Sequence, residues 1–155
     1  MERTRARESQ ISKKFLTDIF SDKDWIAVYH SLQEGIERNA FSAATVESFL
    51  ELALETEEVR LSLRRLLVSE RSWKRREGGK TALSAAEVSR IASVGRVLRE
   101  ARRLWPEPGH ATAEKFLITP HPRLHGETPL KVAASDGGLP AVLELLERVE
   151  EGAPV

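Results

Sequence analysis

The pattern that most constrains the fold is a run of apolar residues at helical spacing between residues 85 and 104. It follows Ser84-Ala85-Ala86-Glu87, a capping-box sequence in which the serine and glutamate side chains each accept a hydrogen bond from the other's backbone N–H. Apolar side chains then recur every three or four residues until Pro106 and Pro108-Gly109 interrupt the pattern. The sequence therefore predicts a capped helix of about twenty residues in this part of the chain.

Shorter segments on both sides of this run have the same helical period, the first of them over residues 11–19. Ser21 is predicted to cap the next helix, with Asp24 in the capping-box position, and Gly35 fits the end of that helix. No segment alternates apolar and polar residues over the length of a strand, so the predicted fold class is all-α. The remaining helices are predicted over residues 42–54, 57–66, 69–77, 111–118, 129–134 and 139–150.

The composition narrows the class of protein. The chain has 155 residues, enough for one ordinary domain or two small ones that share a core. Its 24 basic and 24 acidic residues cancel, which argues against a histone-like protein and against an acidic disordered chain. The absence of cysteine excludes disulfides and thiol nucleophiles, and the cytoplasm is the expected compartment. No apolar run is long enough to span a bilayer and no secretory signal is present, so we expect no membrane partner.

The sequence holds no motif that would support catalysis. His121 and His125 have a spacing that could share a metal ion, but Pro120 and Pro122 prevent the regular helix that would align both rings. A Gly-rich phosphate loop and a Gly-x-Ser-x-Gly pattern are also missing. We therefore expect a protein that is not an enzyme and that has neither a metal site nor a cofactor.

Charge is unevenly distributed along the chain. Residues 60–80 hold eight basic residues and two acidic ones, whereas residues 139–155 hold four glutamates and one arginine. A basic segment of this size is a candidate surface for phosphate groups. The alternative is a solvated helical face that is held by ion pairs between residues four positions apart.

The basic segment also looks like a helix-turn-helix over residues 57–77. A recognition helix would begin near Ser69, with Trp73 anchored in the core. The turn position that usually holds glycine holds Leu67, and a left-handed conformation there would cost about 1 kcal/mol or more. Two packed helices without affinity for DNA are the alternative. The residues predicted to contact DNA are Ser69, Arg71, Ser72, Lys74, Arg75 and Arg76, of which the last two would reach phosphates.

From Leu83 onward the chain resembles the Xre/MbcA/ParS family of antitoxins, which pair with RES-domain toxins. Phe116 and Ser135 stand where the family usually has tryptophan and threonine. The upstream segment from Ser69 to Arg76 is similar to the Xre-like helix-turn-helix of the same family. The residues that carry the resemblance are Leu83-Ser84, Glu87 to Arg90, Val94, Val97, Ala101, Ala113, Phe116-Leu117, Thr119-Pro120, Pro122, Leu124, Gly126, Pro129-Leu130, Ser135, Gly138, Val142, Leu145-Leu146, Arg148 and Gly152.

The resemblance implies three parts of the chain: an N-terminal extension (1–20), an Xre-like helix-turn-helix domain (21–82) and a toxin-binding domain (83–155). It implies neutralisation of a RES-domain toxin, an enzyme that consumes NAD or transfers its ADP-ribose to a protein. Binding of operator DNA for autorepression and a homodimer within a toxin–antitoxin complex are further expectations, with residues 8–38 as a candidate dimer surface. The alternative is a helix-turn-helix transcriptional regulator without a toxin partner.

Two features of the predicted toxin-binding domain fit this role. Prolines and glycine in residues 120–129 favour a rigid loop, which loses little entropy on binding. The acidic last helix and tail are opposite in sign to a pocket for a dinucleotide diphosphate, so we expect them to cover the toxin's NAD cleft. The predicted toxin-binding residues are Pro120, Leu124, Gly126, Pro129, Val142, Leu145, Leu146, Glu147, Arg148, Glu150, Gly152, Ala153, Pro154 and Val155.

Overall fold

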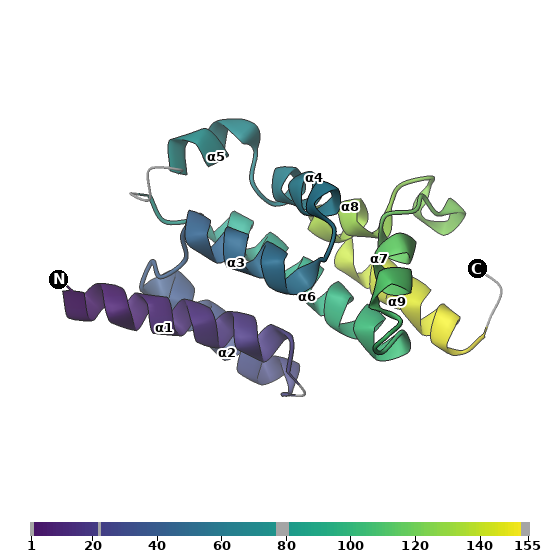
Figure 1. The fold of residues 1–155 in the computed structure, drawn as a ribbon, viewed down its shortest axis with the longest axis horizontal. Helices are drawn as coiled ribbons and strands as arrows, with labels where there is room; N and C mark the ends of the chain where they lie inside the picture. Colours follow the sequence, from purple (N-terminus) through teal and green to yellow (C-terminus); the bar gives the residue numbers. More distant parts are fainter. Residues whose placement is uncertain (1, 22, 77–80, 153–155) are drawn as a thin grey trace.

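A computed structural model describes residues 2–21, 23–76 and 81–152, and in these ranges it confirms the all-α fold (Figure 1). The only β-type pairing among them is an isolated bridge between His121 and Glu127. None of the described helices is long and apolar enough to cross a membrane. The elements are α1 (Glu2–Ile19), α2 (Trp25–Glu37), α3 (Ala43–Ala53), α4 (Glu57–Leu67), α5 (Glu70–Arg76), α6 (Ala85–Leu104), α7 (His110–Leu117), the 3-10 turn η1 (Pro122–Leu124), α8 (Pro129–Ala134) and α9 (Leu139–Glu150).

The helix α6 is the central element of the fold. Its N-terminus has the predicted capping box: Ser84 Oγ accepts from the Glu87 backbone N–H at 3.2 Å, and Glu87 Oε1 accepts from that of Ser84 at 2.8 Å. The helix runs for 20 residues and ends before Pro106, as predicted. It contacts α1 to α4 as well as α7, α8 and α9, and Figure 1 shows it between these two groups of helices.

Buried side chains on both sides of residue 83 form one continuous hydrophobic core. Phe15 of α1, Phe49 of α3 and Leu145 of α9 are all members, and Ile91 of α6 lies between them in the sequence. Because α6 contributes its buried residues to both ends, no gap in the core marks a boundary near residues 82 and 83. The division into three parts remains a prediction.

The first two helices form a hairpin that differs from the prediction in its details. The helix α1 begins at Glu2 rather than near residue 11. Asp24, not Ser21, caps α2, because its side chain accepts from the Ile26 backbone N–H at 3.1 Å. Gly35 does not end α2 but lies within it, where an added Cβ would be 2.1 Å from the Phe41 ring. The glycine is therefore required by close packing rather than by helix termination.

Candidate functional site

The loop that follows α7 is closed by its own backbone. His121 donates its N–H to the Glu127 carbonyl at 3.1 Å, and Gly126 donates to the His121 carbonyl at 3.0 Å. His121 Nδ1 also accepts from the Arg123 N–H at 3.2 Å, which caps the turn η1. His125 and Gly126 both take positive φ angles, 57° and 81°, and reverse the chain. The proline-rich segment thus folds as a tight, internally bonded loop.

Aromatic packing ties the base of this loop to the end of α6. The Phe116 ring lies 5.2 Å from Trp105 and 6.2 Å from His121, measured between centroids. Ile118, the residue after α7, leaves 41% of its surface exposed beside the loop. The sequence interpretation did not single out Ile118.

The predicted toxin-binding residues of this loop fall into two groups. Pro120 and Gly126 are exposed, and the space around the Gly126 α-carbon is open. Leu124 and Pro129 are buried, so they hold the loop and the start of α8 in place rather than present a surface. Thr128 caps α8 by accepting from the Lys131 N–H at 3.2 Å, which fixes where the loop ends.

The last helix, α9, buries its apolar face and exposes an acidic one. Val142, Leu145 and Leu146 are 0–3% exposed and pack on α6 and α8, so these three predicted contacts are core residues in the free chain. The acidic face is formed by Glu144, Glu147, Glu150 and Glu151, all exposed.

Only part of the acidic face of α9 is neutralised within the described residues. Arg103 of α6 binds Glu150 at 3.1 Å and Glu100 at 2.8 Å. The two carboxylates raise the pKa of Arg103, and Glu100 contributes more than Glu150. The predicted residue Arg148 is half-buried and lies 3.9 Å from Glu144. Glu147 has no ion-pair partner in the described part of the chain, so it contributes free negative charge to this face.

The end of the predicted toxin-binding tail is only partly visible. Gly152 is exposed and has a φ of 71°, the left-handed conformation that glycine commonly supplies after a helix. Ala153, Pro154 and Val155 lie outside the described residues. Their predicted role at the toxin's cleft remains a prediction.

The predicted helix-turn-helix segment folds as two helices with a short turn, but the turn has another conformation than expected. Leu67 is the last residue of α4 and fully buried, and Val68 takes extended backbone with φ −136°. No left-handed residue occurs between α4 and α5. The expected strain at Leu67 was therefore wrong, because an extended residue makes the turn instead. Ser69 immediately precedes α5, and its Oγ accepts from the Ser72 N–H at 3.2 Å.

The residues predicted to contact DNA are mostly on the outside of α5. Arg71, Lys74 and Arg75 are exposed, as is Ser69, while Ser72 is half-buried. Trp73 is buried, as predicted, with the Arg64 guanidinium 4.7 Å from the centre of its ring.

The Arg76 side chain does not lie where the sequence predicted it, at a surface from which it would reach a phosphate. It is 5% exposed and its Nη2 binds Glu87 Oε1 of α6 at 2.8 Å. The physical reason is helical geometry, because position 76 lies three residues after Trp73 and therefore on the same inward face.

Glu70 fixes the first turn of α5 to α4. Its Oε1 accepts from Arg64 Nη2 at 2.7 Å and from Arg65 Nε at 3.1 Å. Desolvation acts to raise the pKa of Glu70, but the hydrogen bonds and charges of the two arginines outweigh it and lower that pKa. Arg64 and Arg65 are thus paired with a carboxylate, and most of the described basic residues of the segment that lack such a partner lie on α5.

Two contacts that the sequence interpretation missed join the C-terminal helices to the rest of the chain. Arg102 Nη2 donates to the carbonyls of Leu52 and Ala53, at 2.6 and 2.9 Å, at the end of α3. Burial lowers the pKa of Arg102. Glu114 of α7 accepts from the Glu55 N–H at 2.9 Å. Neither long-range contact leaves a local signal in the sequence.

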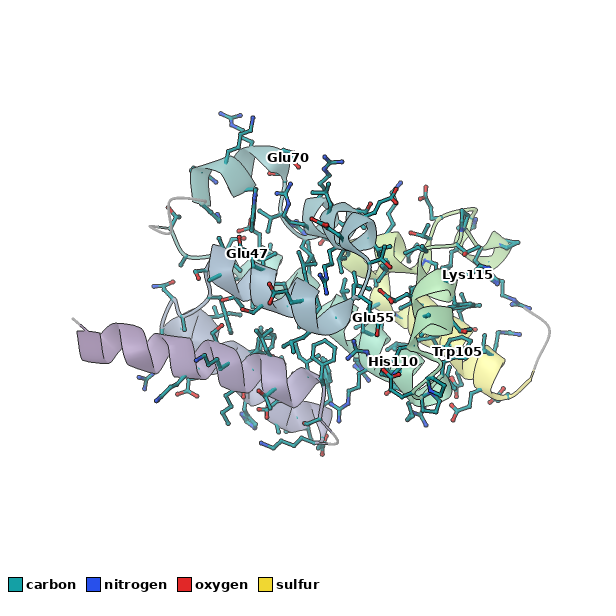
Figure 2. The ribbon with its side chains drawn as sticks, in the orientation of Figure 1. Glu47, Glu55, Glu70, Trp105, His110 and Lys115 are labelled. Carbon is teal, nitrogen blue, oxygen red and sulfur yellow. The ribbon has the colours of Figure 1, made fainter. Side chains whose placement is uncertain are left out.

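The two candidate surfaces lie far apart on the molecule. Figure 2 shows Glu70 at the end of α5 next to α4, whereas Trp105, His110 and Lys115 lie on the other half of the molecule beside α7. The described residues contain no group of three or more histidine, aspartate or glutamate side chains that could hold a metal ion. His121, one of the two histidines considered for a metal, uses Nδ1 to cap η1.

Comparison with known proteins finds a family similarity in the C-terminal part of the chain. Residues 100–152 match the model of a family described as the antitoxin Xre/MbcA/ParS C-terminal toxin-binding domain. No curated protein and no solved structure matches the chain significantly. The matched segment begins within α6, later than the resemblance predicted from Leu83, and comprises the closed loop with α7, α8 and α9. The match confirms the predicted resemblance: the C-terminal third of the chain is similar to the toxin-binding domain of the Xre/MbcA/ParS antitoxins.

Proposed function

We propose that this chain is the antitoxin of a toxin–antitoxin system and that it neutralises a RES-domain toxin by binding it. The observation that carries the proposal is the family match over residues 100–152, which covers the closed loop and the acidic helix α9. A binding protein of this kind needs a shaped surface and no reacting groups, so the proposed role is that of a regulator rather than an enzyme.

The closed loop is the proposed anchor on the toxin. Its backbone hydrogen bonds and the buried Leu124 fix the loop before the toxin arrives, so little conformational entropy is lost on binding. Ile118, Pro120 and Gly126 offer apolar and open surface around this rigid centre. Apolar contacts of this kind form the energetic centre of many protein interfaces.

The acidic face of α9 is the proposed inhibitory element. RES-domain toxins act on NAD, and a pocket for its diphosphate has to be electropositive. Glu150 is paired with Arg103, whereas Glu147 and Glu151 are exposed and take no part in that ion pair. These two glutamates therefore present negative charge to such a pocket. We infer that α9 and the residues after it cover the toxin's cleft and compete with NAD.

A second proposed role is repression of the chain's own operon through α5. The support is the exposed trio Arg71, Lys74 and Arg75, which meets no ion-pair partner among the described residues. Exposed cations of this kind bind DNA phosphates with the release of counterions. A homodimer would match the two-fold symmetry of a palindromic operator.

A co-expression experiment tests the proposed function. A RES-domain toxin is made in one cell with the tagged chain, and the purified complex is washed at high salt. Retention of the toxin and survival of the cells are expected for an antitoxin. A chain that never retains the toxin, yet binds promoter DNA, would be the alternative transcriptional regulator without a toxin partner.

A truncation separates binding from occlusion of the cleft. A chain shortened to residue 149 keeps the closed loop and most of α9 but lacks Glu150 and everything after it. We expect this variant to bind the toxin but to inhibit its consumption of NAD less well than the full chain. Complete inhibition at equal concentration would defeat the proposed role of the tail.

A further inference from the structure

The helix α5 is attached to the rest of the chain through a small number of side chains. It has seven residues, and its buried members are Trp73 and Arg76. Glu70 reaches α4 at the start of the helix, but this contact is exposed to solvent. At the other end of α5, Arg76 forms an ion pair with Glu87 of α6.

The partner of Arg76 is a residue with a second structural role. Arg76 Nη2 lies 2.8 Å from Glu87 Oε1, and the two side chains are each only 6% exposed. The same Oε1 accepts from the Ser84 N–H at 2.8 Å in the capping box of α6. One carboxylate oxygen therefore joins the end of α5 to the first turn of the central helix.

The bonding of Arg76 is incomplete within the described residues. Its Nε and Nη1 are buried and have no hydrogen-bond partner. A buried guanidinium with one ionic partner adds little net stability, because desolvation offsets the attraction. Such a pair instead favours one arrangement of the parts that it joins, since any other arrangement leaves a buried charge without a partner.

We propose that Arg76 and Glu87 are positioning residues that hold α5 in the orientation in which Arg71, Lys74 and Arg75 face DNA. The proposal rests on the proposed binding of DNA by α5. In this view Arg76 never contacts a phosphate; it acts through Glu87. The pair links the DNA-binding helix directly to α6, whose other end belongs to the toxin-binding domain.

A double-mutant cycle tests the proposal with the full chain. Arg76→Met and Glu87→Gln each leave one buried group without its partner, whereas the double variant buries no unpaired charge. Gln is also a normal capping-box residue, so Glu87→Gln preserves the N-terminus of α6. We expect each single variant to weaken binding of duplex DNA from the promoter before its gene by about tenfold or more, and the double variant to recover most of that loss.

Direct contact between Arg76 and a phosphate predicts a different pattern. Glu87→Gln would then free Arg76 and leave DNA affinity unchanged or higher, while the double variant would be as weak as Arg76→Met. The neighbouring Arg75→Ala is the matched control, because the loss of one exposed phosphate contact reduces the slope of log K against log salt by about 0.9 whatever stands at position 87. If the double variant does not recover DNA affinity, the proposal is wrong. The double variant is compared directly with the wild type, so the test works even where a single variant does not fold.

Hydrogen exchange without DNA separates this proposal from the proposed function. We expect the amides of residues 70–76 to exchange about tenfold or more faster in the single variants, while those of α9 stay protected. The double variant should restore protection, and Ser84→Ala should loosen α6 without releasing α5. If the single variants exchange faster but the wild-type chain binds no promoter DNA, the positioning role is supported and DNA binding is refuted. Unchanged exchange in both single variants would overturn the positioning role.

Discussion

The junction between α8 and α9 gives the sharpest test of the packing described above. An added Cβ at Gly138 would lie 1.9 Å from the carbonyl oxygen of Val132 and 2.8 Å from its carbonyl carbon. Carbon and oxygen atoms in close contact are normally about 3.3 Å apart or more. Since both atoms belong to the backbone of α8, Gly138→Ala has to push α9 away from α8 by about 1 Å or more.

Two opposing effects set the size of the change in stability. Gly138 has φ −82° and ψ −19°, which alanine adopts freely. Because alanine lowers the conformational entropy of the unfolded chain, this effect alone would stabilise the protein by about 0.4–1 kcal/mol. Overpacking against backbone costs about 1–3 kcal/mol. The clash outweighs the entropic gain, and we expect a net loss of about 1–2 kcal/mol. For a chain of this size that loss lowers Tm by about 2–8 °C.

Thermal unfolding followed by circular dichroism measures this loss, and Gly137→Ala is the control. Gly137 has φ 73° and open space around its α-carbon, so alanine there costs about 1–2 kcal/mol of backbone strain without moving α9. Both variants lose stability, but only Gly138→Ala should weaken toxin binding. A Gly138→Ala variant with the wild-type Tm and toxin affinity would refute the packing argument.

Three further predictions use other contacts of the structure. Gly35→Ala places a methyl group 2.1 Å from the Phe41 ring, and we expect a loss of about 1–3 kcal/mol in urea unfolding, whereas a helix-interior glycine with open space around it would gain stability from the same change. Leu67→Gly removes a fully buried side chain and should cost about 2–5 kcal/mol in the same assay; a gain would mean that position 67 is left-handed after all. Arg103→Ala opens the exposed contact to Glu150 and should change the unfolding free energy by less than about 1 kcal/mol. The same variant frees Glu150 for the toxin, so isothermal titration should show equal or tighter binding, and clearly weaker binding would contradict the proposed role of the acidic face.

The residues predicted for the two surfaces show where sequence interpretation succeeds. The exposed positions Arg71, Lys74 and Arg75 follow from the spacing around Trp73, because residues on one face of a helix recur at three and four positions. The same rule places Arg76 on the buried face with Trp73, so the error at Arg76 was avoidable. On α9 the rule separates the buried leucines from the exposed glutamates correctly, but it does not say that the buried ones are unavailable to a partner.

What the sequence determined by itself is most of the local structure: the presence of the helices, the capping box of α6 and the prolines that stop that helix. These depend on hydrogen bonds and side-chain spacing within a few residues, which the order of amino acids specifies directly. Only the tertiary structure decided which charges are free. Arg76 meets Glu87, Arg103 meets Glu150 and Arg102 reaches the end of α3 across long stretches of chain. Such partners are set by the packing of whole helices around α6, and no local pattern encodes them.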